Sequence, residues 1–435
     1  MLKRAAAFAL LAMSAGEELR LVTGWAYAGH AGAAAFAAYF VAALAGALPS
    51  QRLVIVAVTG AAVALAAWHS AFSALRSGVH SAVLFAAFLS TMQMLRVALE
   101  TSPLLGEVRS HFARMTSGQQ HDSALLRTHL VASVLGAGGL AALAAMVPPG
   151  TTDTRRCEFA QSGLQGIGLA ALWSPFFVAM VVATRFVPGA SLGRAVASGL
   201  GMALLGLLLS HALYGARRDA APLLRSLRRT AVEVAVLAAG IIVANAVWGV
   251  TSLEAVVLGI PLVSAWVARR ALRDRPGALA VRWFRSLESV AVEAVVVGAA
   301  MILGEVINVL LGQGLVAIPR GAEAWPIPVL IALPPLVMLA TSRAGLHPIV
   351  SASCLLPALA AIDKLHGLAV TGSVLLGWML CVLLSRFVAP VMFAAALFDV
   401  PQAKLVGGRN LRFSACFAAL AVLYLWSLNA LLGGP

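Results

Sequence analysis

Apolar runs recur along nearly the whole chain, separated by short stretches that carry most of the charged residues. Each run has about 17–24 residues, and about 20 apolar residues in a helix are enough to cross the hydrocarbon core of a bilayer. The longest polar stretch, residues 101–127, is too short to form a soluble domain. The pattern predicts an all-α polytopic membrane protein with about 11–12 transmembrane helices.

Two runs differ from the others because serines and prolines interrupt them. These are residues 161–186 and residues 341–363. Polar groups and broken helices are tolerated at membrane depth only where they line a cavity or are buried in protein. We therefore predict two re-entrant hairpins, the first of them bent near Trp173, Ser174 and Pro175.

The arginines predict which side of the membrane each hairpin enters from. Residues 216–230 hold five arginines and residues 268–288 hold six, which is typical of cytoplasmic loops. Counting spans from these loops places both ends of segment 161–186 outside the cell and both ends of segment 341–363 inside. Two hairpins that enter from opposite faces are typical of an inverted-topology repeat.

A short spacing pattern supports this repeat. Gly163, Leu164, Ile167, Ala170 and Pro175 have the same spacing as Gly345, Leu346, Ile349, Ala352 and Pro357. The repeat predicts five segments: N-terminal scaffold helices over residues 1–128, a first repeat core over 129–230, scaffold helices over 231–311, a second repeat core over 312–411, and a C-terminal helix over 412–435.

Composition narrows the class of partner. The chain is 61% hydrophobic and 11% charged, with a mean hydropathy of +0.93. Its net charge of +14 does not indicate nucleic-acid binding, because the basic residues cluster in short loops between apolar runs. We expect membrane lipids and a small solute as partners, and the inner membrane of a bacterium as the location.

Motifs of enzymes and cofactor sites are missing from the sequence. The four cysteines lie far apart and form no C-x-x-C pair, so they predict neither a disulfide framework nor a zinc site. H-E-x-x-H, G-x-x-x-x-G-K-[ST] and G-x-S-x-G are absent. We expect a protein that is not an enzyme and needs no cofactor, apart from Na⁺ as one candidate coupling ion.

Two hairpins from opposite sides, each followed by a span with a small polar break (around Ser198 and around Thr371), resemble the ion transporter superfamily. That superfamily includes divalent-anion/sodium symporters, citrate carriers and arsenite permeases. The resemblance covers roughly residues 129–400 and is architectural, since the Ser-Asn-Thr signatures of the divalent-anion branch are absent. It implies a substrate site at the hairpin tips, carried by an elevator domain against a homodimeric scaffold.

The polar residues of the hairpins are the candidate substrate-binding residues. They are Ser162, Gln165, Ser174, Arg343, His347, Ser351 and Ser353. A guanidinium matches carboxylate or phosphate oxygens in a bidentate manner, so Arg343 favours an anion. The alternatives are that Arg343 is a cytoplasmic residue at the hairpin base and that the serines only pack helices closely.

Four residues are candidates for ion coupling: Glu305, Asn308, Ser198 and Thr371. Glu305 and Asn308 are three residues apart on one face of an apolar run. A carboxylate at membrane depth is costly and often functional, so Glu305 is a candidate proton carrier. Alternatively, it binds Asn308 or a neighbouring helix in a structural role.

The sequence thus favours a secondary-active transporter that moves a small anionic solute with Na⁺ or H⁺. Two alternatives stay open: a membrane-embedded enzyme acting on lipid-linked sugars, and a structural subunit of an envelope complex. The enzyme needs a sizeable outer loop with catalytic residues, and the largest loops here are predicted to be cytoplasmic. The structural subunit predicts hairpin polar groups that are packed against protein.

Overall fold

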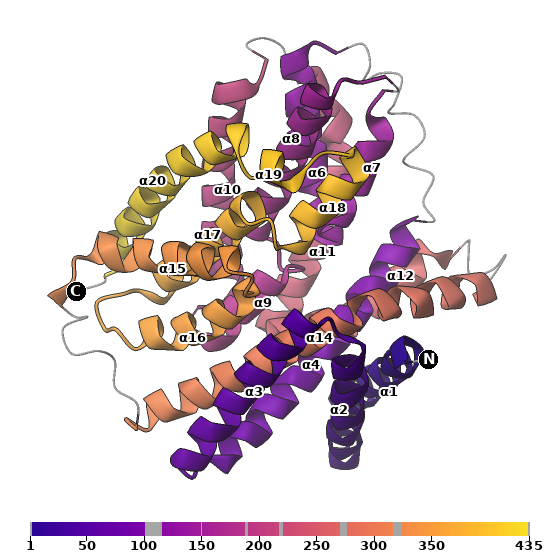
Figure 1. The fold of residues 1–435 in the computed structure, drawn as a ribbon, viewed down its shortest axis with the longest axis vertical. Coiled ribbons are helices and arrows are strands. Elements are labelled where there is room, and N and C mark those ends of the chain that lie inside the picture. Colours follow the sequence, from indigo (N-terminus) through magenta and orange to yellow (C-terminus); the bar gives the residue numbers. More distant parts are fainter. Residues whose placement is uncertain are drawn as a thin grey trace. The chain divides into compact units, whose positions relative to one another are not determined.

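The computed structural model describes residues 2–100, 115–148, 150–187, 190–216, 221–269, 276–315 and 324–433. The chain is 85% helix, and no strand occurs among the described residues, which confirms the all-α class. It divides into two units (Figure 1), the first formed by Met1–Ser102 and Val243–Ile318, the second by Pro103–Ile242 and Pro319–Pro435. Parts of the predicted polar segment 101–127 and of both arginine-rich loops lie outside the described residues.

The first unit is a bundle of long helices. Its helices are α1 (Leu2–Thr23), α2 (Ala26–Gly46), α3 (Pro49–Trp68), α4 (Phe72–Glu100), the end of α11 (Ala221–Trp248), α12 (Ser252–Val267) and α14 (Pro276–Gly312). Among the described residues of this unit, the most extensive contact between two helices is that of α4 with α14. Small residues allow this approach, because a Cβ added at Gly78 would lie 2.8 Å from Cα of Ile302.

The second unit contains two runs of helices in the same order: long, short, long, short, long. The first run is α6 (Ser117–Leu135), α7 (Gly138–Met146), α8 (Asp153–Ala171), α9 (Val178–Phe186) and α10 (Leu192–Tyr214). The second is α15 (Ile327–Arg343), α16 (Pro348–Ala360), α17 (Gly367–Leu384), α18 (Ala389–Phe398) and α20 (Gly408–Leu431), with the short α19 (Gln402–Leu405) before α20.

In each run, a serine at one interruption between helices makes the same pair of backbone contacts. Ser174, between α8 and α9, donates to the carbonyl of Ser133 and accepts from the Phe176 amide at 3.1 Å. Ser385, between α17 and α18, donates to the carbonyl of Ser342 at 2.9 Å and accepts from the Phe387 amide at 3.4 Å. These hydroxyls bind backbone groups that the interrupted helices leave free.

Glycines at matching positions bring the long helices of each run together. A Cβ added at Gly166 of α8 would lie 2.6 Å from the carbonyl oxygen of Leu125 on α6. A Cβ added at Gly377 of α17 would lie 3.1 Å from Cα of Pro335 on α15. The glycines are 377 − 166 = 211 positions apart, as are Ser174 and Ser385 (385 − 174 = 211).

The structure changes the interpretation of the second polar segment. The first segment is interrupted at residues 172–177, where its bend was predicted. In the second, helix α16 continues through Pro357, and the interruption lies at residues 344–347. Pro348 occupies the first turn of α16, where its missing N–H costs nothing, and it forces the preceding His347 into extended backbone.

The glycines that the sequence spacing aligned also differ in local structure. Gly163 lies in the middle of α8 against Leu140 and Leu143, whereas Gly345 lies in the interruption after α15 with φ +95°. The offset of 182 residues between them therefore does not relate equivalent positions. In the matching serine contacts, Ser174 and Ser385 are 211 positions apart, and their partners Ser133 and Ser342 are 342 − 133 = 209 apart.

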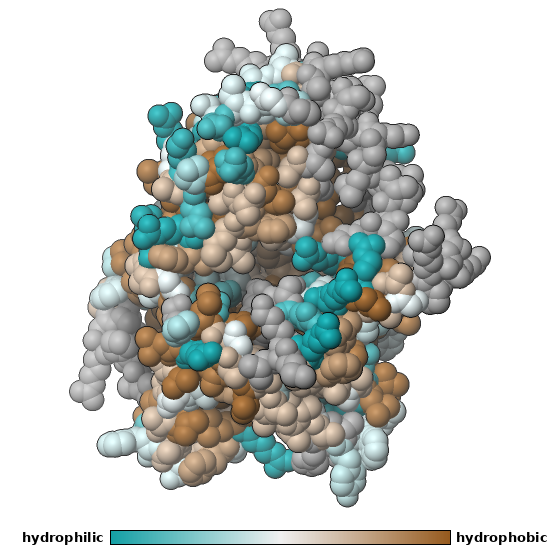
Figure 2. Space-filling model, turned by 45° about the vertical axis from the view of Figure 1, so that its right-hand side comes forward, coloured by the Kyte–Doolittle hydropathy of each residue, from teal (hydrophilic) through white to brown (hydrophobic). Residues whose placement is uncertain are grey.

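Within the described part of the chain, six helical segments are long and apolar enough to cross a membrane by length and composition. They are Gln51–Trp68, Phe72–Ala98, Leu192–Tyr214, Ala294–Gly312, Gly367–Phe398 and Gln402–Leu431. Five further apolar helices have 10–17 residues and are shorter than a full span. Figure 2 shows apolar residues over much of the visible face, as expected for a multi-pass membrane protein.

Candidate functional site

The predicted site residues are divided between the two units. Glu305 and Asn308 lie on α14 of the first unit, whereas the seven predicted substrate residues, Ser198 and Thr371 belong to the second. In the first unit, Ser77 of α4 donates to Glu305 at 3.0 Å. Glu305 is 7% exposed, so its carboxylate is part of the α4–α14 contact.

Ser162 and Gln165 lie in a cluster of polar side chains between α6, α8, α10 and α20, which we call the polar cluster. Its members are Gln120, His121, Arg155, Glu158, Ser162, Gln165, Ser210, Tyr214, Arg409 and Asn410. The two predicted residues are buried, as are His121, Ser210 and Asn410. Apolar helices come together here around side chains that hydrogen-bond to one another.

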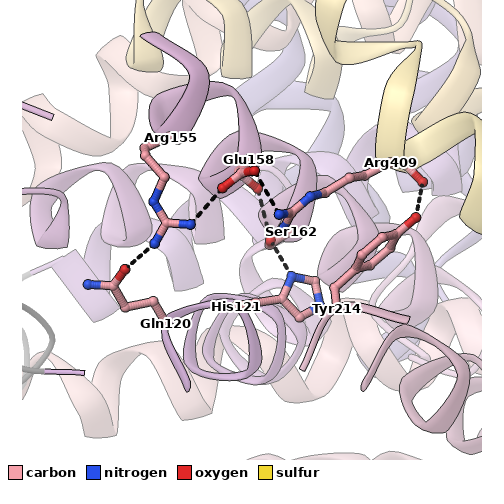
Figure 3. A network of polar contacts seen from close by, with 7 residues as sticks. All are labelled: Gln120, His121, Arg155, Glu158, Ser162, Tyr214 and Arg409. Atoms are coloured by element: carbon pink, nitrogen blue, oxygen red, sulfur yellow. Dashed lines mark hydrogen bonds and ion pairs between the residues drawn. The ribbon is translucent and has the colours of Figure 1, made fainter. Parts of the chain in front are cut away.

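Ion pairs form the outer part of the polar cluster (Figure 3). Arg155 and Arg409 bind the carboxylate of Glu158 at 2.6 Å and 2.7 Å. Arg155 also donates to Gln120 at 2.5 Å, and the hydroxyl of Tyr214 donates to the carbonyl of Arg409 at 3.1 Å. The two guanidiniums share one carboxylate that is 22% exposed. This arrangement fixes α20 against α8.

A chain of hydrogen bonds continues into the buried part. His121 contacts Ser162 through Nδ1 at 2.7 Å and Ser210 through Nε2 at 3.0 Å. Ser210 donates to Gln165 at 2.7 Å, and Gln165 donates to Asn410 at 3.0 Å. The bond between Gln165 and Asn410 joins residues 245 positions apart. Sequence reasoning missed His121, Ser210 and Asn410 because the spacing along one helix does not show such contacts.

Several predicted residues have structural partners at the interruptions. Ser351 shares a hydrogen bond with Thr341 at 2.7 Å, and Ser174 binds the carbonyl of Ser133. His347 accepts from the Ile349 amide at 3.3 Å, and its ring lies edge-on to Trp378, with centroids 5.8 Å apart. These contacts end and begin helices, so they stabilise the broken backbone without any ligand.

Three predicted hydroxyls are buried and lack partners. Among the described residues, no hydrogen-bond partner lies near Oγ of Ser198, Oγ of Ser353 or Oγ1 of Thr371. Ser353 is 0% exposed and Thr371 is 1% exposed. Leaving a buried hydroxyl unsatisfied costs about 1–3 kcal/mol, so these three groups are exceptions to the pairing of buried polar groups.

Two arginines lie at the interruptions of the second run. Arg343 donates weakly to the carbonyl of Leu384 at 3.4 Å, and the guanidinium of Arg386 lies 4.9 Å from the ring centre of Phe387. Both arginines are exposed, and no carboxylate of the described residues forms an ion pair with either. The bond between Ser385 and Ser342 joins the two interruptions that carry them.

Within the described residues, no group of three or more His, Cys, Asp or Glu side chains is placed to hold a metal ion. No family model matches the chain, and no curated protein sequence is significantly similar to it.

Proposed function

We propose that the chain is a secondary-active transporter that moves a small anionic solute across a bacterial inner membrane, coupled to H⁺ or Na⁺. The second unit is the transport core in this proposal. The observation that carries it is the pair of interrupted helices, α8–α9 and α17–α18. Each is fixed by the same serine contact, and α8 and α17 contact each other.

Interrupted helices are costly inside a membrane because their free backbone groups must be satisfied. They are typical of solute and ion sites in transporters built from inverted repeats. We infer such a repeat from the two runs of long and short helices, with α6 to α10 equivalent to α15 to α20. In the proposal these runs have opposite orientations in the membrane, the core moves as an elevator, and the protein is a homodimer.

Arg343 and Arg386 favour an anion as the solute. Helix α16 begins at Pro348, after Arg343, and helix α18 begins at Ala389, after Arg386. A helix N-terminus carries a partial positive charge. Arg343 follows Ser342, and Arg386 follows Ser385. The serines that make the same contacts in the first run, Ser133 and Ser174, are followed by Val134 and Pro175. At these two positions only the second run carries positive charge, which favours a single anion site.

The experiment is uptake by the full chain in proteoliposomes, with radiolabelled phosphate, sulfate and succinate as probes. Losing a charge-assisted hydrogen bond costs about 1.5–3 kcal/mol, so Arg343→Ala is expected to reduce uptake by about 10–100-fold. Arg386→Ala is expected to act in the same direction. Arg343→Lys rescues only part of the activity, because an ammonium cannot bind an oxyanion in a bidentate manner.

Arg412→Ala is the matched control, since Arg412 is also an exposed arginine of the second unit. It should transport like the wild type. If Arg343→Ala and Arg386→Ala both keep wild-type uptake of a probe that the wild type accumulates, the arginines do not bind the solute. If the wild type accumulates and exchanges none of the probes, an anion transporter of this class is the wrong assignment.

A further inference from the structure

His121 has an unusual position within the polar cluster. It lies in the second turn of α6, is 2% exposed, and both of its ring nitrogens face hydroxyl groups. One hydroxyl comes from α8 and the other from α10 (Figure 3 shows the contact with Ser162). The role of the ring depends on whether these hydroxyls donate to it or accept from it.

The hydrogens of both hydroxyls are already used elsewhere. Ser162 donates to the carbonyl of Glu158 at 2.8 Å, and Ser210 donates to Oε1 of Gln165 at 2.7 Å. The orientation of Gln165 is set in turn by Asn410, whose side-chain amide donates to the carbonyl of Leu405 at 2.9 Å. Both hydroxyls therefore offer lone pairs to the imidazole.

Only the charged form of histidine has hydrogens on both ring nitrogens. A neutral ring satisfies one of the two hydroxyls, and the other contact then joins two acceptors unless a serine gives up its own hydrogen bond. The hydrogen-bond pattern around His121 therefore suits an imidazolium. A bound proton would satisfy every group in the chain from Ser162 to Asn410.

The surroundings oppose that charge in the observed conformation. His121 lies outside the six candidate spans, and burial together with the positive charges of Arg409 and His211 lowers its pKa to about 3. The other charged groups near it are Arg155 and Glu158 on α8 and Asp122 beside it on α6. Tyr214 of α10 lies edge-on at 5.4 Å, and α7 carries no titratable residue.

The equilibrium between the charged and neutral forms of His121 thus depends on the positions of the surrounding helices. A small movement that weakens the repulsion by the positive charge of Arg409, or admits water, would let the ring take up a proton and complete its hydrogen bonds. Asp122, the next residue along α6, binds His211 at 3.0 Å, and His211 is 41% exposed to water. A group whose proton affinity differs between two conformations couples proton binding to the change between them.

We propose that His121 is the proton-binding residue that couples transport to a pH gradient, with Ser162 and Ser210 accepting the two N–H groups of its charged ring. The ring takes one proton from water in one conformation and returns it to water in the other, and no other bond changes. This inference rests on the proposed transport function. It replaces Glu305, which Ser77 binds in the first unit, as the coupling residue.

The transport test compares two measurements on the same proteoliposomes with the probe that the wild type transports. One is counterflow exchange at equal pH, and the other is accumulation driven by an acidic outer solution. His121→Gln is expected to reduce pH-driven accumulation by at least about tenfold and counterflow by much less. His80→Gln, an exposed histidine of the first unit, is the control and should match the wild type.

A second variant guards against a folding defect in the first. Ser162→Ala keeps the imidazole but removes one acceptor of the charged ring, so the midpoint of the pH response should move down by about one unit. Equal pH-driven accumulation in His121→Gln and the wild type overturns the inference. A loss in Glu305→Gln with none in His121→Gln overturns it in favour of the carboxylate.

Proton binding is also measured without transport. The ¹⁵N resonances of the His121 ring, identified by their loss in His121→Gln, are followed with pH in detergent. The inference expects a midpoint above about 5, because the sample includes the conformation that binds the proton. A ring that stays neutral down to about pH 4 overturns it. If the wild type exchanges no probe, the transport function fails, and this titration alone decides whether His121 binds a proton.

Discussion

Ser174→Ala tests whether the serine contact at the interruption between α8 and α9 holds the helices together. Ser174 is 0% exposed, and its hydroxyl binds two backbone groups, the carbonyl of Ser133 and the amide of Phe176. Alanine leaves both groups buried without a partner. Each loss costs about 1–3 kcal/mol, so the variant should lose about 2–6 kcal/mol of unfolding free energy.

The assay is thermal unfolding of the purified chain in detergent, followed by intrinsic fluorescence. At about 2–4 °C per kcal/mol for a domain of this size, Tm should fall by about 4–24 °C. Ser385→Ala should behave similarly, because Ser385 makes the same contacts in the second run. The two variants together measure whether both interruptions are equally important.

Ser353→Ala is the matched control for this measurement. Ser353 is also a serine with 0% exposure, but its hydroxyl has no partner among the described residues. Its replacement removes an unsatisfied polar group, so Tm should stay the same or rise slightly. Anion uptake should fall in Ser353→Ala if this hydroxyl binds the solute or the coupling ion. An unchanged Tm in Ser174→Ala, or an equal loss in Ser353→Ala, would refute the reasoning.

Two further predictions concern helix packing and topology. Gly166→Ala should destabilise the chain by about 1–3 kcal/mol, because its Cβ would lie 2.6 Å from a backbone oxygen. Its control is Gly240→Ala, which has open space around the added Cβ and should raise Tm slightly in the same assay. Single cysteines at the exposed positions Asp153 and Ser191, on either side of α8 and α9, should react with an impermeant reagent from the same side of the membrane. Labelling from opposite sides would mean that this segment crosses the membrane once and is not a hairpin.

The sequence by itself determined the helical class and the interruption near Ser174 and Pro175. Long apolar runs can satisfy their backbone in a membrane only as helices, and the described chain has no strand. The effect of a proline on the adjacent backbone can also be read from the sequence. The interruption at Ser174 and Pro175, and the extended backbone of His347 before Pro348, follow from the covalent geometry of proline and from a serine that binds free backbone groups.

The partners of the polar residues were decided only by the tertiary structure. Helix α17 shows the reason, since every residue from Leu368 to Leu384 is buried and no apolar stripe indicates which side faces which neighbour. Ser162 and Gln165 were recognisable as polar residues in an apolar run. Their contacts with His121 and Asn410 depend on how α6 and α20 pack against α8, which close contacts such as that at Gly166 set.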